Sequence, residues 1–236
     1  MKLKLFIIFL FFLTACKSIS NDNSKDSAQN SKIKIDTLQK IDSNFYQDTI
    51  VINDMKFIQT IKDNKFECLK TVSGDTIIKS ENYYFEIKFL DIDKDNFKDI
   101  RVFITSNSPN QCDNYLYDKS LKTFKKIENC DNDIKKIKGT IYYSTYNSIG
   151  CGDLNWESYL CKIEKLKLIH CGHIIGQGCE FEIEKNPQII EIYKIDNEKE
   201  ILIEKLPYLI NIPKFDNKWD FIDKYWTKNY RKFEMK

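Results

Sequence analysis

The side chains most suited to chemistry form a short acidic run, Asp91-Ile92-Asp93-Lys94-Asp95-Asn96-Phe97-Lys98-Asp99. Counted from Asp91, carboxylates stand at positions 1, 3, 5 and 9, and an asparagine stands at position 6. Alternating side chains of a tightly curled loop converge on one point, where position 7 adds a backbone carbonyl. Calcium takes about six to eight oxygen ligands. The spacing therefore predicts a calcium site, with the ligands Asp91, Asp93, Asp95, Phe97 and Asp99.

This loop departs from an EF-hand in two ways. Position 12 is Val102, where a bidentate glutamate belongs, and the flanking residues 83–90 and 100–105 have the character of strands. Asn96 replaces the usual glycine, and asparagine tolerates the left-handed backbone better than most residues. A solvated acidic turn neutralised by Lys94 and Lys98 is the alternative interpretation. If calcium binds, we expect a structural role, because the sequence places no catalytic base beside the loop.

A strand, a DxDxDNxxD loop and a second strand together resemble the calcium loops of FG-GAP and VCBS-type repeats. The resemblance extends loosely over residues 83–127, where Tyr115-Leu116-Tyr117-Asp118 and Thr123-Phe124 are also similar to those repeats. Such repeats occur in β-propellers and related extracellular proteins, but one loop does not indicate a complete propeller. A single-loop variant occurs in small periplasmic lipoproteins, some of which resemble immunity proteins against lysozyme-like toxins. The resemblance thus implies a non-catalytic inhibitor, without assigning inhibitor residues.

Seven cysteines follow Cys16, so at least one of them stays free or pairs between chains. Proximity in sequence favours a Cys112–Cys130 disulfide. Two more bonds could come from the group Cys151, Cys161, Cys171 and Cys179. Cys68, which lies far upstream, is our candidate for the unpaired thiol. The sequence does not settle the pairing.

Both histidines, His170 and His173, lie within this cysteine-rich region. Zinc takes four nitrogen or sulfur ligands in structural sites, but the spacing matches no standard zinc motif. An oxidising compartment also favours disulfides over thiolates, so we do not expect zinc. A Cys171–His170 nucleophilic pair is equally unexpected, because adjacent residues of a strand point to opposite faces. The glycines around Cys151 and at 172–178 indicate turns.

The elements that must position these residues are mainly strands. Apolar residues recur with a period of two, and short runs are separated by turns at Ser73-Gly74-Asp75, Glu164-Lys165 and Asp196-Asn197. The expected strands are 48–52, 55–61, 66–71, 76–79, 83–90, 100–105, 114–117, 123–127, 140–146, 156–163, 166–171, 180–184, 189–195 and 201–205. This pattern predicts a mainly β fold: an antiparallel sandwich, barrel or partial propeller-like sheet.

The C-terminus has a different period. Apolar residues at steps of three and four form one helical face, namely Trp219, Ile222, Trp226, Tyr230 and Phe233. We expect this C-terminal helix to pack its aromatic face against the sheet. A ligand-stacking surface is the alternative interpretation.

The N-terminus indicates where the protein works. Lys2 and Lys4 precede an apolar run from Leu5 to Leu13, which is too short to span a bilayer. Leu13-Thr14-Ala15-Cys16 then resembles the lipobox of bacterial lipoproteins. The resemblance implies a signal peptide over 1–15, removed before Cys16, and a membrane anchor of diacylglycerol and acyl chains such as palmitate on Cys16. We expect a flexible tether over 16–44, because 17–31 is almost wholly polar, and one β-rich domain over 45–236.

Charge excludes one class of partner. Lys2 and Lys4 are the only charged residues of the predicted signal peptide, so the rest of the chain has 35 basic and 35 acidic side chains. A nucleic-acid binder would carry a basic excess, so we expect none. A hydrolase is the weakest hypothesis, because G-x-S-x-G, H-E-x-x-H and P-loop motifs are missing.

The expected function is therefore that of a non-catalytic binding domain in the cell envelope, lipid-anchored on the extracytoplasmic side. An inhibitor or immunity protein against a cell-wall enzyme is the first form of this hypothesis. An envelope structural or surface-interaction lipoprotein with a protein partner is the alternative.

Overall fold

The computed structural model describes residues 39–42, 45–80, 84–106, 110–181 and 187–234. The predicted signal peptide, the predicted lipidation site Cys16 and most of the predicted tether lie outside these residues. Strand β1 (Gln39–Asp42) falls within the segment 16–44, and its backbone pairs with that of strand β2. Paired structure therefore begins before Phe45, inside the segment that we expected to be a tether.

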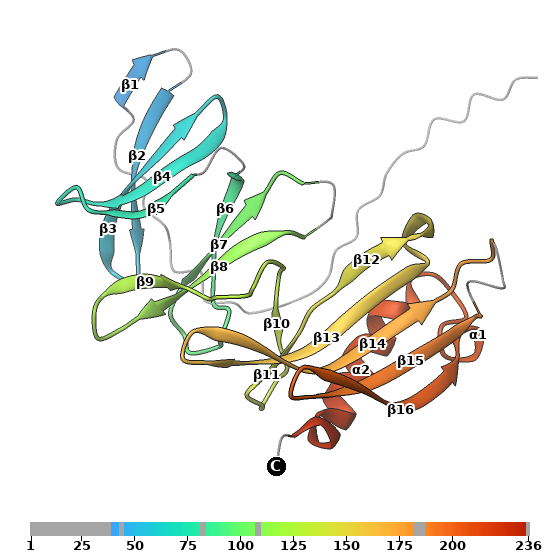
Figure 1. Cartoon of the computed structure of the whole chain (residues 1–236). Helices are drawn as coiled ribbons and strands as arrows, with labels where there is room; N and C mark the ends of the chain where they lie inside the picture. Colours follow the sequence, from blue (N-terminus) through green and yellow to red (C-terminus); the bar gives the residue numbers. More distant parts are fainter. Residues whose placement is uncertain (1–38, 43–44, 81–83, 107–109, 182–186, 235–236) are drawn as a thin grey trace, which may run out of the picture. The chain divides into compact units, whose positions relative to one another are not determined.

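The described chain is mainly β and antiparallel, which confirms the predicted fold class (Figure 1). The first sheet has the order β1-β2-β3-β4-β5. Its remaining strands are β2 (Phe45–Ile52), β3 (Met55–Lys62), β4 (Lys65–Thr71) and β5 (Thr76–Lys79). The turn between β2 and β3 consists of Asn53 and Asp54, with φ values of 49° and 62°. Two successive left-handed residues match the twist of a tight hairpin, and asparagine and aspartate tolerate them best.

The second sheet has the order β6-β7-β8-β9 and carries the acidic loop. Its strands are β6 (Tyr84–Leu90), β7 (Asp99–Ile104), β8 (Cys112–Asp118) and β9 (Thr123–Lys126). The acidic loop connects β6 to β7, so two strands fix both of its ends. This is the strand–loop–strand arrangement that the sequence predicts.

The third sheet has the order β10-β11-β13-β14-β15-β16, and β12 also pairs with β13. Its strands are β10 (Lys135–Lys136), β11 (Tyr142–Ser144), β12 (Asn147–Gly150), β13 (Asn155–Glu164), β14 (Lys167–Gln177), β15 (Ile189–Asp196) and β16 (Lys199–Pro207). Within the described residues, none of the three sheets closes on itself, so the barrel alternative does not apply.

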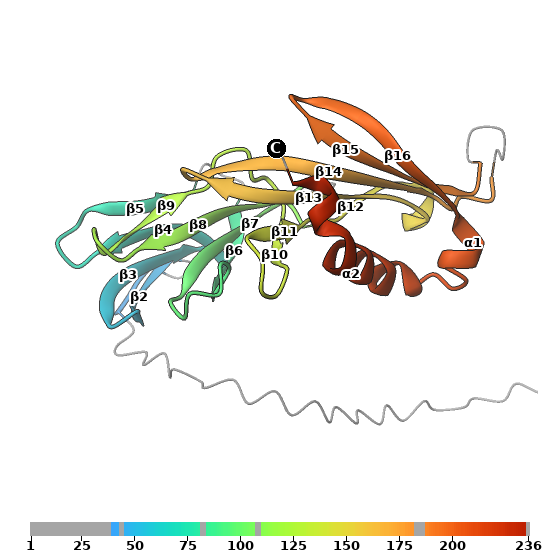
Figure 2. The ribbon, with the colours of Figure 1, turned by 90° about the horizontal axis from the view of Figure 1, so that it is seen from below.

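The expected C-terminal helix is present as α2 (Asn217–Asn229) and continues into a short 3-10 turn, η2 (Tyr230–Phe233). A four-residue helix, α1 (Tyr208–Asn211), precedes it. Figure 2 shows α2 against one face of the third sheet. Ile222, Trp226 and Phe233 are buried there, whereas Trp219 is 44% exposed. The aromatic face therefore packs on the sheet, as we expected. Over the described residues, no helix has the length and apolar character needed to cross a membrane.

Three apolar clusters hold the described elements together. One lies between the third sheet and α2 and contains Trp156, Ile174 and Trp226. A second is shared by the first and second sheets and includes Phe57 and Val102. A third joins the region of the acidic loop to the third sheet, and its buried members are Ile92, Ile127, Cys130, Ile134, Tyr143, Cys161 and Leu168.

Strand β14 corrects the interpretation of its glycines as turns. Gly172 and Gly176 lie inside the strand, which runs on to Gln177 instead of ending at Cys171. A Cβ at Gly176 would stand 2.2 Å from the ring of Trp156, and one at Gly172 would stand 2.5 Å from that of Phe233. These positions are glycine because large aromatic rings pack directly on the backbone. The strand expected at 180–184 is not found in its described part, since Glu180 and Phe181 do not belong to a strand.

Candidate functional site

The acidic loop brings three of its carboxylates together. One oxygen each of Asp91, Asp93 and Asp99 lies within 4.8 Å of the other two. Lys94 and Asn96 take the left-handed backbone, with φ values of 61° and 72°, which curls the loop. This agrees with the expectation for Asn96. Among the described residues, this is the one group of at least three histidine, cysteine or acidic side chains whose ligand atoms converge.

The loop is held in this shape by its own backbone. The amides of Asp95 and Asn96 donate to the two carboxylate oxygens of Asp91, at 3.0 and 3.1 Å. Asp95 N–H also lies 3.2 Å from Oδ1 of Asp93. A carboxylate has about four lone-pair sites, so these hydrogen bonds leave acceptor capacity on Asp91 and Asp93.

Asp95 makes contacts that the sequence prediction does not include. Asp95 is not part of the converging group: Oδ1 accepts the Phe97 N–H at 2.9 Å, and Oδ2 pairs with Lys119 at 3.0 Å. The Phe97 ring stacks on Tyr117 with centroids 5.5 Å apart, and Lys119 Nζ lies 4.3 Å from the Phe97 centroid. Lys119 therefore supplies the positive charge at Asp95, a role that the sequence did not indicate.

Asp99 lies at the base of the site and is 1% exposed. Its carboxylate accepts the N–H groups of Ile92 at 2.7 Å and Tyr117 at 2.9 Å. Burial raises the pKa of Asp99 to about 7, although both N–H groups act in the opposite direction. Burial, followed by the charges of Asp95 and Asp91, also raises the pKa of Asp93. The site thus concentrates carboxylates, and the Lys136 ammonium offsets only part of the rise in the pKa of Asp93.

Asn53 fastens the loop from the turn between β2 and β3. Its Nδ2 donates to the carbonyl of Lys98 at 2.8 Å, and its Oδ1 accepts the Lys98 N–H at 2.7 Å. The side-chain amide thus binds the Lys98 backbone as a neighbouring strand would. Sequence reasoning missed Asn53, because an asparagine at a tight turn needs no further explanation.

The third sheet approaches the same site. The Lys136 ammonium donates to the Tyr143 hydroxyl at 3.1 Å, and burial lowers the pKa of Lys136. Burial raises the pKa of Tyr143, and the nearby carboxylates Asp93, Asp99 and Asp91 add to that rise.

The residues present fit a hard divalent cation. Three carboxylates converge, two of them have raised pKa values, and the donors are oxygen atoms only, which calcium prefers. In such a site Asp91, Asp93 and Asp99 would hold the ion, and its charge would offset the repulsion among them. Because all three converging carboxylates would be ligands of the ion, the arrangement suits a structural ion.

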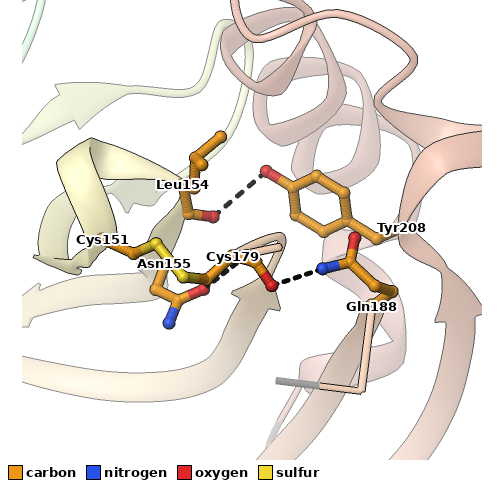
Figure 3. Close-up of a disulfide and its surroundings, with 6 residues drawn as sticks. All are labelled: Cys151, Leu154, Asn155, Cys179, Gln188 and Tyr208. Atoms are coloured by element: carbon orange, nitrogen blue, oxygen red, sulfur yellow. Dashed lines mark hydrogen bonds between the residues drawn. A yellow bond between two sulfur atoms is a disulfide. The ribbon is translucent and has the colours of Figure 1, made fainter. Parts of the chain in front are cut away.

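One disulfide joins Cys151 to Cys179. Around it, the Cys179 N–H donates to Asn155 Oδ1, Gln188 Nε2 donates to the Cys179 carbonyl, and the Tyr208 hydroxyl donates to the Leu154 carbonyl (Figure 3). This bond is one of the pairings that the sequence allowed. Cys68 is free, as we expected of the unpaired thiol.

The expected Cys112–Cys130 bond is not present. Both residues are buried free thiols, and Asn114 Nδ2 lies 3.5 Å from the sulfur of Cys112 and 3.2 Å from that of Cys130. Burial raises the pKa of each thiol to about 12. Cys161 and Cys171 are also free, because they point into different apolar clusters although they lie on neighbouring strands.

The histidines belong to a separate polar group on the third sheet. An extra residue in β14, Cys171, makes a bulge opposite Leu160 and Cys161. The bulge restores His170 and His173 to one face, where both rings stack on Tyr159, at 4.4 and 4.1 Å. The two nitrogens of His173 face Glu200 at 2.7 Å and Glu157 at 3.2 Å.

This arrangement separates the residues that we considered for zinc. Cys179 is in the disulfide, and Cys171 lies in the cluster under α2. His173 has a carboxylate at each ring nitrogen. His170 and Cys171 do not form a nucleophilic pair, since His170 stacks on Tyr159 and the Cys171 thiol faces the Ile169 carbonyl.

Comparison with known proteins gives no family. No family model matches the chain, and no curated protein matches it. One similar solved structure is described as "Structure of a Xanthomonas Type IV Secretion System related protein". It aligns with a TM-score of 0.40 at 10% identity, over 73% of this chain and 87% of that chain. A similarity at this level carries no argument about function, so the proposals below rest on the residues themselves.

Proposed function

We propose that this chain is a non-catalytic binding domain whose acidic loop is stabilised by calcium. The observation that carries the proposal is the convergence of Asp91, Asp93 and Asp99 within 4.8 Å. Two further observations support it: the Asp99 carboxylate is buried and hydrogen-bonded at the bottom of the site, and Asn53 binds the backbone of Lys98. Both contacts position the loop before any ion arrives. A bound ion would then fix the connection between β6 and β7.

The setting of this domain is the cell envelope. The basic N-terminus, the short apolar run and the lipobox ending at Cys16 support a lipid-anchored, extracytoplasmic protein. The Cys151–Cys179 disulfide is consistent with an oxidising compartment.

Calcium binding is tested by thermal unfolding of wild type and Asp93→Ala, each with calcium and with a chelator. We expect calcium to raise the melting temperature of wild type by several degrees and to leave Asp93→Ala unchanged. An exposed aspartate on another strand, Asp196, gives the matched control Asp196→Ala, which should respond to calcium like wild type. Equal melting temperatures of wild type in calcium and chelator would contradict the proposal.

The first candidate for the bound partner is a cell-wall muramidase. Support comes from the resemblance of residues 83–127 to single-loop lipoproteins, some of which resemble inhibitors. The test is an inhibition assay of the purified domain against a panel of muramidases. We expect one member to be inhibited at a stoichiometry of about one; a panel that retains full activity would remove this candidate.

A second candidate, a surface-interaction lipoprotein, is favoured by the last strand of the third sheet. Within the described residues β16 pairs only with β15, and Ile201, Leu202 and Ile203 are 41–50% exposed on it. Exposed apolar edge strands pair with other chains. Leu202→Lys should abolish capture of an envelope partner that wild type retains, whereas an unchanged capture pattern would remove this candidate.

A further inference from the structure

The disulfide closes an unusual turn. Cys151, Gly152 and Asp153 form a single 3-10 turn, η1, in which all three residues have positive φ values of 52°, 59° and 72°. Two of these three are not glycine, so the backbone is unfavourable there unless other contacts hold it. The Cys151–Cys179 bond ties this turn to the chain just beyond the end of β14 (Figure 3).

The same turn holds a buried charge of the C-terminal helix. The Lys218 side chain, in the first turn of α2, is 0% exposed. Its ammonium donates to the Asp153 carbonyl at 2.8 Å and to the Asp153 carboxylate at 2.5 Å. The Tyr146 hydroxyl also donates to this carboxylate. Burial raises the pKa of Asp153, but the hydrogen bonds from Lys218 and Tyr146 outweigh it and the pKa is lowered.

Aromatic rings surround the remaining side of the ammonium. Lys218 Nζ lies 3.8 Å from the ring centroid of Phe215, 5.2 Å from Trp219 and 5.5 Å from Tyr146. Rings attract a cation but accept no full hydrogen bond from it. Asp153 is therefore the one anionic partner of Lys218 among the described residues. Without Asp153 the ammonium could not stay buried, because an unpaired charge in such a site is strongly unfavourable.

We propose that the Cys151–Cys179 disulfide is a redox-sensitive lock on the N-terminal end of α2, acting through Asp153. A dithiol reductant opens it: one thiolate attacks the sulfur of Cys151, the Cys179 thiolate leaves, and the second thiol of the reductant resolves the mixed disulfide. The products are two protein thiols and the oxidised, cyclic disulfide of the reductant. Freed from Cys179, the turn leaves its left-handed conformation, Asp153 moves away, and Lys218 turns out to solvent.

The contacts at Cys179 determine which side moves. Its N–H and carbonyl are held by Asn155 and Gln188, so Cys179 keeps its place after reduction. The turn residues on the other side are more exposed: Gly150 and Gly152 are exposed, and Cys151 is half-buried. The carbonyl of Leu154, directly after the turn, accepts the Gly178 N–H and the Tyr208 hydroxyl, so the movement on reduction is confined to residues 151–153, which include Asp153.

The test is acetylation of lysines by an N-hydroxysuccinimide ester, read residue by residue by peptide mass mapping of the folded full chain. In the oxidised protein we expect Lys218 to be protected. Dithiothreitol should raise its labelling rate at least tenfold, and so should Cys151→Ser without reductant. Lys224, whose side chain is 80% exposed on the same helix, should be labelled equally throughout.

Matched variants distinguish a specific effect of the disulfide on Lys218 from a general loss of stability. Cys68→Ser removes a free thiol and should leave Lys218 protected until reductant is added. Asp153→Asn should expose Lys218 even with the disulfide intact, so the proposal stays testable if Cys151→Ser does not fold. A Lys218 labelling rate that stays within twofold after complete reduction, or in Asp153→Asn, would overturn the proposal.

Discussion

Asn53 and Lys98 bind each other twice, at 2.8 and 2.7 Å, across 45 residues of sequence. The first comes from a hairpin turn of the first sheet, and the second from the acidic loop of the second sheet. The pair shows that the loop is positioned from outside, by a residue that contributes no carboxylate.

This clamp makes a prediction about affinity. Asn53→Ala removes two hydrogen bonds that hold the loop, each worth about 0.5–1.5 kcal/mol net. We expect the calcium affinity to fall about tenfold, measured by calorimetric titration. Asn197 occupies an equivalent turn position between β15 and β16, with the same φ of 49°. Asn197→Ala should therefore introduce the same backbone strain at a turn and leave the calcium affinity unchanged. An equal loss of calcium affinity in both variants would show that Asn53 does not hold the loop.

Asp99 makes the stability of the calcium-free protein depend on pH. Its pKa is about 7 in the folded chain and about 3.9 when unfolded, so folding favours the protonated form. The contribution of Asp99 is fully present below pH 4 and is lost as pH rises towards and through 7. Its size is up to roughly 4 kcal/mol.

The measurement is urea unfolding in chelator between pH 4.5 and 8. Asp99→Asn should remove most of the decline with pH, whereas Asp196→Asn, with an exposed side chain, should keep it. Calcium should bind more tightly as pH rises through 7, because the ion needs the carboxylate. A wild-type free energy of unfolding that does not decline over this range would contradict the buried Asp99.

The Lys218–Asp153 pair predicts a stability difference within α2. Lys218→Met leaves Asp153 without its ammonium, and breaking a buried pair from one side costs about 3 kcal/mol. Lys224→Met, on the exposed side of the same helix, should change stability by less than about 0.5 kcal/mol. Chemical denaturation of both variants checks this. The double variant Lys218→Met/Asp153→Asn should recover part of the loss; a fully stable single variant would show that the pair contributes nothing.

The glycines of β14 predict a packing effect. Gly176→Ala places a methyl group 2.2 Å from the buried Trp156 ring, which must move. We expect a loss of about 2–3 kcal/mol by thermal or urea unfolding. Gly139→Ala is the comparison: its φ is +73°, but no atom lies within 4 Å of the added Cβ, so about 1 kcal/mol is expected. Equal losses of stability in the two variants would mean that the contact with Trp156 does not add to the destabilisation.

Local patterns predicted much of this fold. Alternation of apolar residues marked most strands, and the steps of three and four from Trp219 to Phe233 marked the C-terminal helix. Periodicity failed where packing between distant residues determines the structure. Glycines are common in turns, so we expected turns at Gly172 and Gly176, yet both lie in a strand on which Phe233 and Trp156 pack.

The candidate site was predicted in part for the same reason. Spacing along one loop was enough to bring Asp91, Asp93 and Asp99 together. Asp95 pairs with Lys119 instead, and Asn53 binds the loop from another sheet. The spacing of residues within the loop predicts neither contact. Cysteine pairing failed similarly, since the bulge at Cys171 and the inward direction of Cys161 depend on sheet geometry.

In the function that we propose, Asp91, Asp93 and Asp99 hold one calcium ion. Calorimetric titration of calcium into the chelator-stripped domain and into Asp93→Asn tests it most directly. We expect one site in wild type, with a dissociation constant of about 10⁻⁴–10⁻³ M as in extracellular modules, and no binding in the variant. No heat of binding in wild type, or the same isotherm in both proteins, would contradict it.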